Sequence, residues 1–347
     1  MSNRNSSETI ADARVAVVGA GAWGTTLANL LGLNRRPVTL LTNTDAQADL
    51  LNRTRENDRY LPGVPLSPAL AITSDPERAL NGADVIAIVV PSQKMRAVAA
   101  DVLRFAGDDS RIVSLAKGIE LGSLLRMSEV IHAATGVPGE RICALSGPNL
   151  AREIAAGLPA SAVVASTSID AAIAVQRALS TPTFRLYTST DVVGVELGGA
   201  LKNVVALGAG VADGLELGQN AKAAFIARGL AEMIRLGVAA GANPLTFGGL
   251  SGLGDLIATC ESPLSRNRTF GEQLGRGASV ADATGETPHV VEGLTTARAA
   301  LALAERSGVR MPIATTVAAV LDGTMSVSEA IGALMSRDSR PELDAWG

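Results

Sequence analysis

RVAVVGAGAWGTTLANLLG, residues 14–32, is the stretch that decides the fold. A short β-branched run leads directly into glycines spaced G-x-G-x-x-G, and an apolar segment of helical character follows. In the order strand, tight turn, helix, this spacing is typical of a dinucleotide-binding turn. Gly19 would permit the turn, Gly21 would let a pyrophosphate approach the backbone, and Gly24 would let helix and strand pack closely. The alternative is a glycine-rich turn that serves packing alone.

Six further apolar runs rich in β-branched residues alternate with Ala- and Leu-rich segments of helical period. These runs are 38–41, 84–90, 111–115, 142–145, 161–166 and 183–187. Apolar strands separated by helices are typical of a parallel sheet covered on both faces. After about Asp191 the strand-like runs stop, and long segments rich in Ala, Gly and Leu take over. The sequence therefore predicts an α/β fold, with a Rossmann-like, doubly wound, mostly parallel sheet followed by an all-α C-terminal domain.

We expect three segments along the chain. The polar start lacks an apolar signal core and predicts a disordered tail over residues 1–12. A dinucleotide-binding domain is expected over 13–190, and a helical substrate-binding and catalytic domain over 191–340.

Composition excludes several classes of protein. Thirty basic against 34 acidic residues give a net charge of −4, which argues against a nucleic-acid binder. Two Cys and two His argue against a disulfide framework and against a metal site. The long charge-free run 236–254 is rich in glycine, which argues against a membrane span. These features indicate a soluble protein of a reducing compartment.

The segment after the second predicted strand bears on the choice between NAD and NADP. Asp45 lies near the distance at which an acidic residue contacts the adenosine ribose, but it equally fits the first turn of a helix, which we favour. Arg53 and Arg55 would reach a 2′-phosphate or form a solvated helix end. The sequence leaves the cofactor preference open.

Three later strands end in unusual loops, at 90–93, 116–120 and 146–149. Since ligands of open parallel sheets bind outside the carboxyl ends of the strands, we expect these loops beside the glycine turn. Lys117 would then be a cation directed at the ligand. The loop 146–149 would present backbone N–H groups to an anion or cap a helix.

Lysine is scarce, with four residues among the 30 basic ones, so each position is informative. Lys202 lies in an apolar helical segment, with Gly198 and Gly199 on the same face one turn earlier. Two helical glycines are costly, and close approach of a ligand or another backbone would explain them. Burial and a nearby Lys117 would both lower the pKa of Lys202, which suits a general acid or base. The alternative is a lysine that extends along helix packing to reach water.

Two segments further on combine charge with turn residues. Asp255 lies among glycines and apolar residues. The run Ser-Arg-Asn-Arg at 265–268 starts a predicted helix and is typical of a phosphate-binding turn, or of a capped amphipathic helix with solvated arginines. The run VVEG at 290–293 does not by itself indicate a function.

Taken together, these residues resemble the NAD(P)-dependent glycerol-3-phosphate dehydrogenase family of the bacterial type. The matching motifs lie at 19–28, 90–93, 116–120, 146–154, 195–224, 252–260, 265–271 and 290–293. The resemblance implies reduction of dihydroxyacetone phosphate to sn-glycerol 3-phosphate with NAD or NADP, supplying phospholipid biosynthesis. It also implies a homodimer in the cytoplasm.

The resemblance assigns roles by position. Lys202 would be the catalytic proton donor and acceptor, and Asp255 would orient Lys202 or a substrate hydroxyl. Substrate contacts are implied for Lys117, Gly147, Asn149, Lys202, Asp255, Ser265, Arg266 and Asn267. Cofactor contacts are implied for Gly19, Gly21, Ala22, Trp23, Gly24, Lys117, Ala151, Arg266, Val290 and Glu292.

The sequence departs from the family pattern at two places. Members that use NADP often carry a basic residue where this chain has Thr42-Asn43-Thr44, and Asn149 replaces a more usual small hydroxyl residue. Two alternatives remain: a related two-domain dehydrogenase of the ketopantoate reductase or β-hydroxyacid dehydrogenase type, and a non-catalytic dinucleotide sensor. The 265–268 run argues against the first for any unphosphorylated substrate, and Lys202 in an apolar helix argues against the second.

Overall fold

The computed structural model describes residues 13–285, 290–336 and 341–342, which form two compact units. The predicted tail, residues 1–12, lies outside the described residues. The second unit starts at Val193 and also takes in two earlier loops, 117–126 and 146–148. In the sequence-based prediction both loops fall within the first domain, because that domain is taken as one contiguous segment, 13–190. They join the second unit because Lys117 and Gly147, which they carry, bond to each other in a cluster with Asp255.

The first unit is built on one large sheet with the strand order β10-β9-β8-β7-β6-β1-β2-β5. Its strands are β1 (Val15–Val18), β2 (Val38–Leu41), β5 (Ala71–Thr73), β6 (Val85–Ile88), β7 (Arg111–Ser114), β8 (Ile142–Ser146), β9 (Ala160–Ala165) and β10 (Phe184–Ser189). The neighbours from β5 to β8 are parallel, as are β9 and β10. The predicted mostly parallel, Rossmann-like sheet is therefore confirmed.

All seven predicted runs form strands of this sheet, and the structure adds elements that the sequence analysis missed. The strand β5 has three residues, and a separate hairpin pairs β3 (Glu56–Asn57) with β4 (Leu61–Pro65). β3 and β5 carry too few residues to show an alternating or β-branched pattern, and β4, LPGVP, contains two prolines and a glycine, which are depleted in strands.

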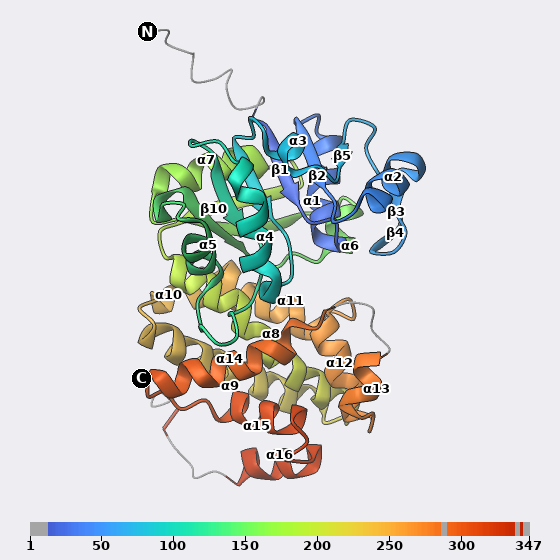
Figure 1. Ribbon diagram of the computed structural model, residues 1–347. Coiled ribbons are helices and arrows are strands. Elements are labelled where there is room, and N and C mark those ends of the chain that lie inside the picture. Colours follow the sequence, from blue (N-terminus) through green and yellow to red (C-terminus); the bar gives the residue numbers. More distant parts are fainter. Residues whose placement is uncertain (1–12, 286–289, 337–340, 343–347) are drawn as a thin grey trace. The chain divides into compact units, whose positions relative to one another are not determined.

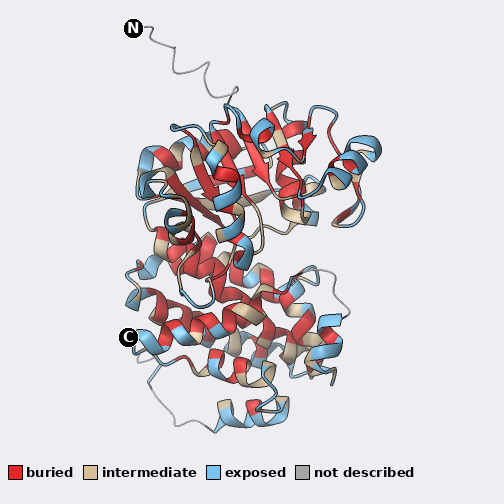
Figure 2. Cartoon of the chain, viewed as in Figure 1, coloured by how far each residue is buried: buried red, intermediate tan, exposed pale blue. Residues whose placement is uncertain are grey.

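The helices of the first unit follow the strands, as Figure 1 shows. They are α1 (Ala22–Leu33), α2 (Asp45–Thr54), α3 (Pro76–Leu80), α4 (Met95–Val102), α5 (Met127–Thr135), α6 (Ala151–Ala155) and α7 (Ile169–Leu179). All four residues of β1 and of β6 are buried, and Figure 2 shows the central strands coloured as buried. Because β1, β6, β7 and β8 run parallel, the segments that follow them leave the sheet at one edge.

The second unit is helical from Val193 onward in the part that the structure describes, which confirms the predicted all-α region. Its helices are α8 (Val192–Gly214), α9 (Gly218–Ala239), α10 (Pro244–Phe247), α11 (Asp255–Glu261), α12 (Arg266–Gly275), α13 (Val280–Gly285), α14 (Glu292–Arg306), α15 (Pro312–Leu321) and α16 (Val327–Met335). By length and composition α8 would be able to cross a membrane, but 89% of its most apolar window is buried within the structure. It is the central core helix of this unit.

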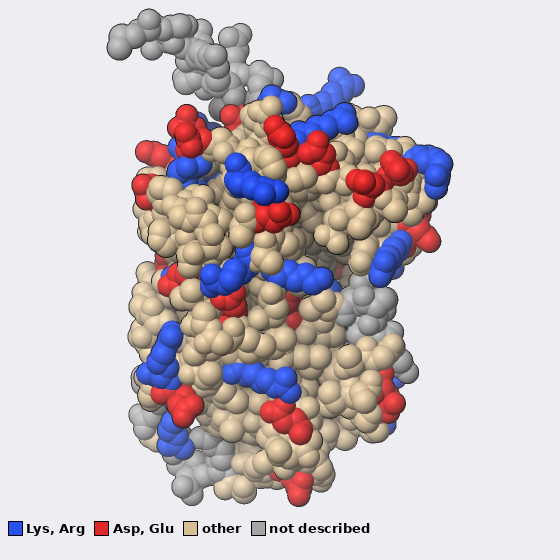
Figure 3. All heavy atoms as spheres, in the orientation of Figure 1, with Lys and Arg blue, Asp and Glu red and all other residues tan. Residues whose placement is uncertain are grey.

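Charged side chains of both signs are interspersed on the face of each unit that Figure 3 shows.

Candidate active site

The turn between β1 and α1 requires glycine at two positions. Gly19 has a φ of +108°, and a Cβ there would lie 2.5 Å from the carbonyl oxygen of Val89. A Cβ on Gly24 would collide with the carbonyl oxygen of Gly19. At Gly21 the position of a Cβ has no neighbouring heavy atom within 4 Å, so its backbone is open to a ligand. The turn thus combines two positions fixed by packing with one that leaves room for a phosphate group.

The start of α1 fits an anionic ligand. Gly21 is the N-cap and provides no side chain to cap the helix, and the first turn contains no acidic residue. The N–H groups of Ala22, Trp23 and Gly24 belong to this first turn, where the helix dipole favours negative charge. The Trp23 ring packs edge-on against Phe184, with ring centroids 5.8 Å apart, and this contact holds the turn to the sheet.

A second segment of the first unit lies against α1. The hydroxyl of Thr26 donates a hydrogen bond to the carbonyl oxygen of Ala151 at 3.3 Å, which places the start of α6 beside α1. Just before this helix, neither polar atom of the Asn149 side-chain amide has a hydrogen-bond partner among the described residues. A buried amide without partners is costly, so a bound ligand would relieve this cost.

The segment after β2 forms a helix cap, as the favoured interpretation of Asp45 predicts. Thr44 is the N-cap of α2 and accepts a hydrogen bond from the backbone N–H of Gln47 at 3.2 Å, while Asp45 lies in the first turn and bonds to Ser74. The guanidinium of Arg55 donates to backbone carbonyls, including that of Leu70 at 3.0 Å. Arg55 is therefore held by the loop before β5.

One buried carboxylate joins two lysines in the second unit. Asp255 is 1% exposed, and its Oδ1 accepts a hydrogen bond from Lys202 Nζ at 2.5 Å. Its Oδ2 accepts from Lys117 Nζ at 2.6 Å. Lys117 also donates to the carbonyl oxygen of Gly147 at 2.8 Å, and Lys202 donates to the hydroxyl of Thr259 at 2.6 Å. Four predicted site residues from four distant segments thus meet at one cluster, which we call the lysine cluster.

Burial dominates the electrostatics of the lysine cluster. It lowers the pKa of Lys202 to about 8, against about 10.5 for an exposed lysine. The neighbouring Lys117 ammonium lowers this pKa further, whereas the carboxylate of Asp255 raises it. The expected effects of burial and of Lys117 are therefore correct in sign, and Asp255 is the opposing influence that keeps the amine from a still lower pKa.

The glycines before Lys202 are explained by close packing, of Gly198 against backbone and of Gly199 against side chains. A Cβ on Gly198 would lie 2.6 Å from the carbonyl oxygen of Ser251, and one on Gly199 would collide with the hydroxyl of Ser146. Ser251 belongs to a π-helical turn, Leu250–Gly254, that leads directly into Asp255. Such turns occur often at functional sites, and this one brings Asp255 against α8.

A chain of side-chain amides extends from the lysine cluster to α12. Asn203, next to Lys202, donates to the carbonyl oxygen of Lys117 at 3.3 Å. Its own Oδ1 accepts from the Asn267 amide at 2.9 Å, and Asn267 accepts from the backbone N–H of Gly293 at 2.9 Å. The starts of α12 and α14 are therefore linked to the helix that carries Lys202.

Thr259 and Asn203 are site residues that the sequence analysis missed. Thr259 accepts the second hydrogen bond of Lys202, and it lies one helical turn after Asp255. The sequence does contain a signal for Thr259. Residues four apart on a helix lie on the same face, so a helix that starts at Asp255 places Thr259 beside it. Asn203 carried no signal, because an asparagine in an apolar helix has many possible partners.

The remaining predicted residues lie around the starts of α12 and α14. Ser265 is buried and caps α12 by accepting a hydrogen bond from the N–H of Arg268 at 3.3 Å. Arg266 is exposed as the first residue of α12, and Val290 is 46% exposed just before α14, which begins at Glu292. Val290 has an apolar side chain, and in the described part of the chain no hydrogen bond joins the side chain of Arg266 to the lysine cluster.

Two family models match the chain over most of its length. The N-terminal model of NAD-dependent glycerol-3-phosphate dehydrogenase matches residues 14–172, and its C-terminal model matches 191–332. A glycerol-3-phosphate dehydrogenase [NAD(P)+] from Frankia casuarinae is 51% identical over 329 residues, which are 95% of this chain and 98% of the relative. The chain belongs to the NAD-dependent glycerol-3-phosphate dehydrogenase family.

Solved structures agree with this membership. The crystal structure of a glycerol-3-phosphate dehydrogenase from Coxiella burnetii matches with a TM-score of 0.89 and 36% identity, over 94% of this chain and 99% of that chain. A ketopantoate reductase from Ralstonia eutropha matches with a TM-score of 0.57 and 17% identity, over 89% and 97% of the two chains. That second likeness shows a shared fold alone, so the alternative of a ketopantoate reductase is not favoured.

Proposed function

We propose that this chain catalyses reduction of dihydroxyacetone phosphate to sn-glycerol 3-phosphate, reversibly, with NADH or NADPH as hydride donor. The observation that carries the proposal is the lysine cluster, in which a buried amine with a pKa of about 8 is held by Asp255 and Thr259. A pKa near neutrality suits a group that both gives and takes a proton. The identity of the substrate is inferred from membership of the family.

Lys202 is the proposed proton donor. When bound, the nicotinamide cofactor supplies the hydride that goes to the carbonyl carbon of the substrate. Lys202 Nζ gives a proton to the carbonyl oxygen, so that a ketone becomes a secondary alcohol. Asp255 and Thr259 accept hydrogen bonds from the same ammonium and fix its position. Lys117 is proposed to contact substrate and cofactor, since it approaches the other oxygen of Asp255 and the carbonyl of Gly147.

The start of α12 is the proposed phosphate site. Arg266 is exposed at the first helical position, and Asn267 follows it. A guanidinium, an amide and helix N-terminal N–H groups are the donors that phosphate oxygens prefer. Ser265 is proposed to contribute its backbone, because its hydroxyl already caps the helix. Gly147 and Asn149 complete the proposed substrate contacts, Asn149 through its unpartnered amide.

The cofactor is proposed to bind along the glycine turn. Gly19, Gly21 and Gly24 with Ala22 and Trp23 would hold the pyrophosphate, since Gly21 is open and the helix start has no side-chain cap. Further proposed cofactor contacts are Lys117, Ala151, Arg266, Val290 and Glu292. Of the two candidates for a 2′-phosphate, Arg55 already donates to backbone carbonyls and Arg53 is exposed, so we propose Arg53 as the contact for that group. Asp45, the candidate for the adenosine ribose, lies in the first turn of α2 and bonds to Ser74.

We further propose that the enzyme works as a cytoplasmic homodimer and that its product supplies phospholipid biosynthesis. The support is the likeness to bacterial relatives of almost the same length, such as the one from Frankia casuarinae. Sedimentation of the purified protein would measure the oligomeric state.

The reaction itself is tested by following the absorbance of reduced nicotinamide. Purified enzyme with dihydroxyacetone phosphate is expected to oxidise NADH, NADPH or both, and the comparison gives the cofactor preference. Ketopantoate serves as the competing substrate. Absence of oxidation with either cofactor would overturn the proposed function.

Replacing Arg266 by alanine is expected to raise the KM for dihydroxyacetone phosphate and to change kcat little. A charge-assisted hydrogen bond contributes about 1.5–3 kcal/mol, so the KM should rise about 10- to 100-fold. Steady-state kinetics at saturating cofactor measures both constants. Arg276→Ala, at the far end of the same helix with a side chain 69% exposed, is the matched control. An unchanged KM in the Arg266 variant contradicts the phosphate assignment.

The pH dependence of the two directions should differ in sign. Reduction requires the protonated form of Lys202, so kcat/KM with dihydroxyacetone phosphate should be constant at low pH and fall as the pH rises through about 8. Oxidation of glycerol 3-phosphate requires the neutral amine and should rise through the same midpoint. Initial rates measured in both directions between pH 6 and pH 11 give the profiles. A midpoint near 10.5, the value of an exposed lysine, would contradict the assignment.

A further inference from the structure

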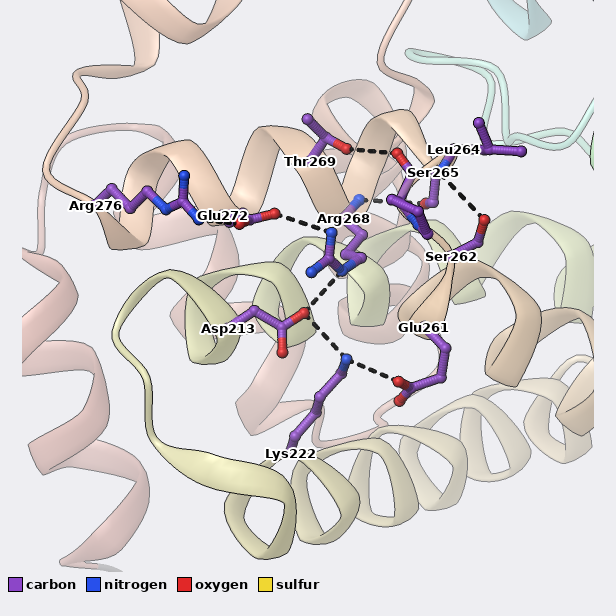
Figure 4. Close-up of polar contacts among 11 residues, drawn as sticks. Asp213, Lys222, Glu261, Ser262, Leu264, Ser265, Arg268, Thr269, Glu272 and Arg276 are labelled. Carbon is purple, nitrogen blue, oxygen red and sulfur yellow. Dashed lines mark hydrogen bonds and ion pairs between the residues drawn. The ribbon is translucent and has the colours of Figure 1, made fainter.

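Lys222 is a second buried lysine, and it lies outside the lysine cluster. It is 3% exposed, and its Nζ donates to Asp213 Oδ2 at 3.0 Å and to Glu261 Oε2 at 3.1 Å. Asp213 Oδ2 also accepts from Arg268 Nε at 2.8 Å, and Arg268 donates to Glu272 at 2.9 Å. Figure 4 shows Asp213 between the two cations. We call these five residues the ion cluster.

The ion cluster lies where α8 and α12 meet backbone to backbone. Gly210 and Gly214 are one turn apart on α8, and Gly271 and Gly275 are one turn apart on α12. A Cβ on Gly210 would lie 2.9 Å from the backbone N of Glu272, and one on Gly275 would lie 3.0 Å from the Cα of Gly214. Small residues spaced in this way let two helices approach more closely than side chains would allow.

The glycines set the distance between the two helices, and apolar side chains pack beside them, including Leu207 on α8 and Phe270 and Leu274 on α12. Helices fix their register through side chains that insert into holes on the partner helix, and the glycine positions themselves offer none. A buried polar or ionic group at a helix contact is a well-attested means of fixing register. Asp213 lies between the two glycines of α8, and Arg268 and Glu272 flank Gly271 on α12. The ion cluster therefore occupies the positions where register would be set.

Register matters here because each helix carries part of the proposed site. Lys202 and Asn203 lie on α8, and Arg266 and Asn267 begin α12. The hydrogen bond from Asn267 to Asn203 depends on how the two helices are aligned. A displacement of about 1 Å between reacting groups and binding groups is enough to cost up to about 100-fold in rate.

The ion cluster also includes α11, which carries Asp255 and Thr259. Glu261 is the last residue of this helix, where the dipole disfavours negative charge. The ammonium of Lys222 offsets that charge and ties the end of α11 to α9 and, through Asp213, to α8. Four helices are thus joined at one point.

We propose that the ion cluster fixes the register of α8 against α12 and thereby places the phosphate-binding start of α12 at its working distance from Lys202. Its members are positioning residues that do not touch the substrate. This inference rests on the proposed function, because it assumes that the start of α12 binds the substrate phosphate.

The test compares two substrates that differ by the phosphate group. Asp213→Asn removes the shared charge without changing size. We expect kcat/KM for dihydroxyacetone phosphate to fall about 10-fold or more, while kcat/KM for dihydroxyacetone and the KM for the reduced cofactor stay within about 2-fold. A loss of folded protein would lower the apparent kcat/KM for both substrates by the same factor. The ratio of the two kcat/KM values therefore isolates the effect of helix register. Lys222→Met, of similar volume, is the second variant and is expected to lower the same ratio.

Arg298→Gln is the control, because it removes an exposed ion pair, to Asp322, that lies outside the ion cluster. Thermal unfolding shows which variants are folded at the assay temperature. If wild-type enzyme prefers the phosphorylated ketone and the two cluster variants keep that preference, the register inference is wrong and the proposed function stands. If the wild type shows no preference, the proposed function fails, and this inference fails with it.

Discussion

Replacing Lys202 by methionine is expected to lower kcat for dihydroxyacetone phosphate reduction by about 100- to 10,000-fold, the usual contribution of a positioned proton donor. Lys202 is the buried amine whose pKa of about 8 suits proton transfer, and methionine fills similar space without a proton to give. The fold should survive the change, because Asp255 keeps its ion pair with Lys117.

Cofactor binding provides the internal control for this variant. The glycine turn lies in the other unit, so the dissociation constant of NADH, measured by fluorescence titration, should stay within about 3-fold of the wild-type value. A variant that binds cofactor and still reduces dihydroxyacetone phosphate at the wild-type rate would contradict the role of Lys202. Arginine at the same position would keep a charge, but its guanidinium holds its proton too tightly to give it to the substrate near neutral pH, so it should not restore the rate.

The sheet was predictable because its strands are short, apolar and β-branched and alternate with helices. Val15–Val18 and Val85–Ile88 are buried on both faces, which removes the alternation of polar residues and leaves a continuous apolar signal. The strand Ala71–Thr73 joins the sheet edge with three residues, and its pairing with β2 decides its structure more than its own composition does. Tertiary pairing of that kind leaves no local pattern in a sequence.

The two lysines, Asp255 and Gly147 of the lysine cluster were predicted as site residues, but Thr259 and most of the connections were not. Lys117 and Lys202 stand out because lysine is rare in this chain, and Gly198 and Gly199 indicate a close approach on the same helix face. The family resemblance implied that Asp255 orients Lys202 or a substrate hydroxyl, whereas its simultaneous pairing with Lys117, 138 residues away, follows only from the fold. Sequence analysis assigned Arg268 to a phosphate-binding run, and the structure instead pairs its guanidinium with Asp213 and Glu272. Nothing local distinguishes an arginine that meets a ligand from one that meets a carboxylate.

Asp255→Asn is expected to lower the rate of reduction about 100-fold at pH 8 and to move the midpoint of its pH profile below 8. The carboxylate is the largest influence that raises the pKa of Lys202, while burial and Lys117 lower it, so its removal lets the lowering influences dominate. Less of the amine is then protonated at pH 8, and the remaining ammonium has lost the acceptor at 2.5 Å that orients it.

The direction of the midpoint shift separates this role from a structural one. Removing one partner of a buried ion pair costs about 3–5 kcal/mol of stability, so part of any lost activity would reflect unfolded protein. A smaller folded fraction lowers the rate at every pH and leaves the midpoint in place. A midpoint that moves to lower pH therefore shows that Asp255 sets the protonation of Lys202, and an unmoved midpoint with reduced activity shows that it acts on stability alone. Arg276→Gln, which removes an exposed ion pair, should change neither the rate of reduction nor the midpoint of its pH profile.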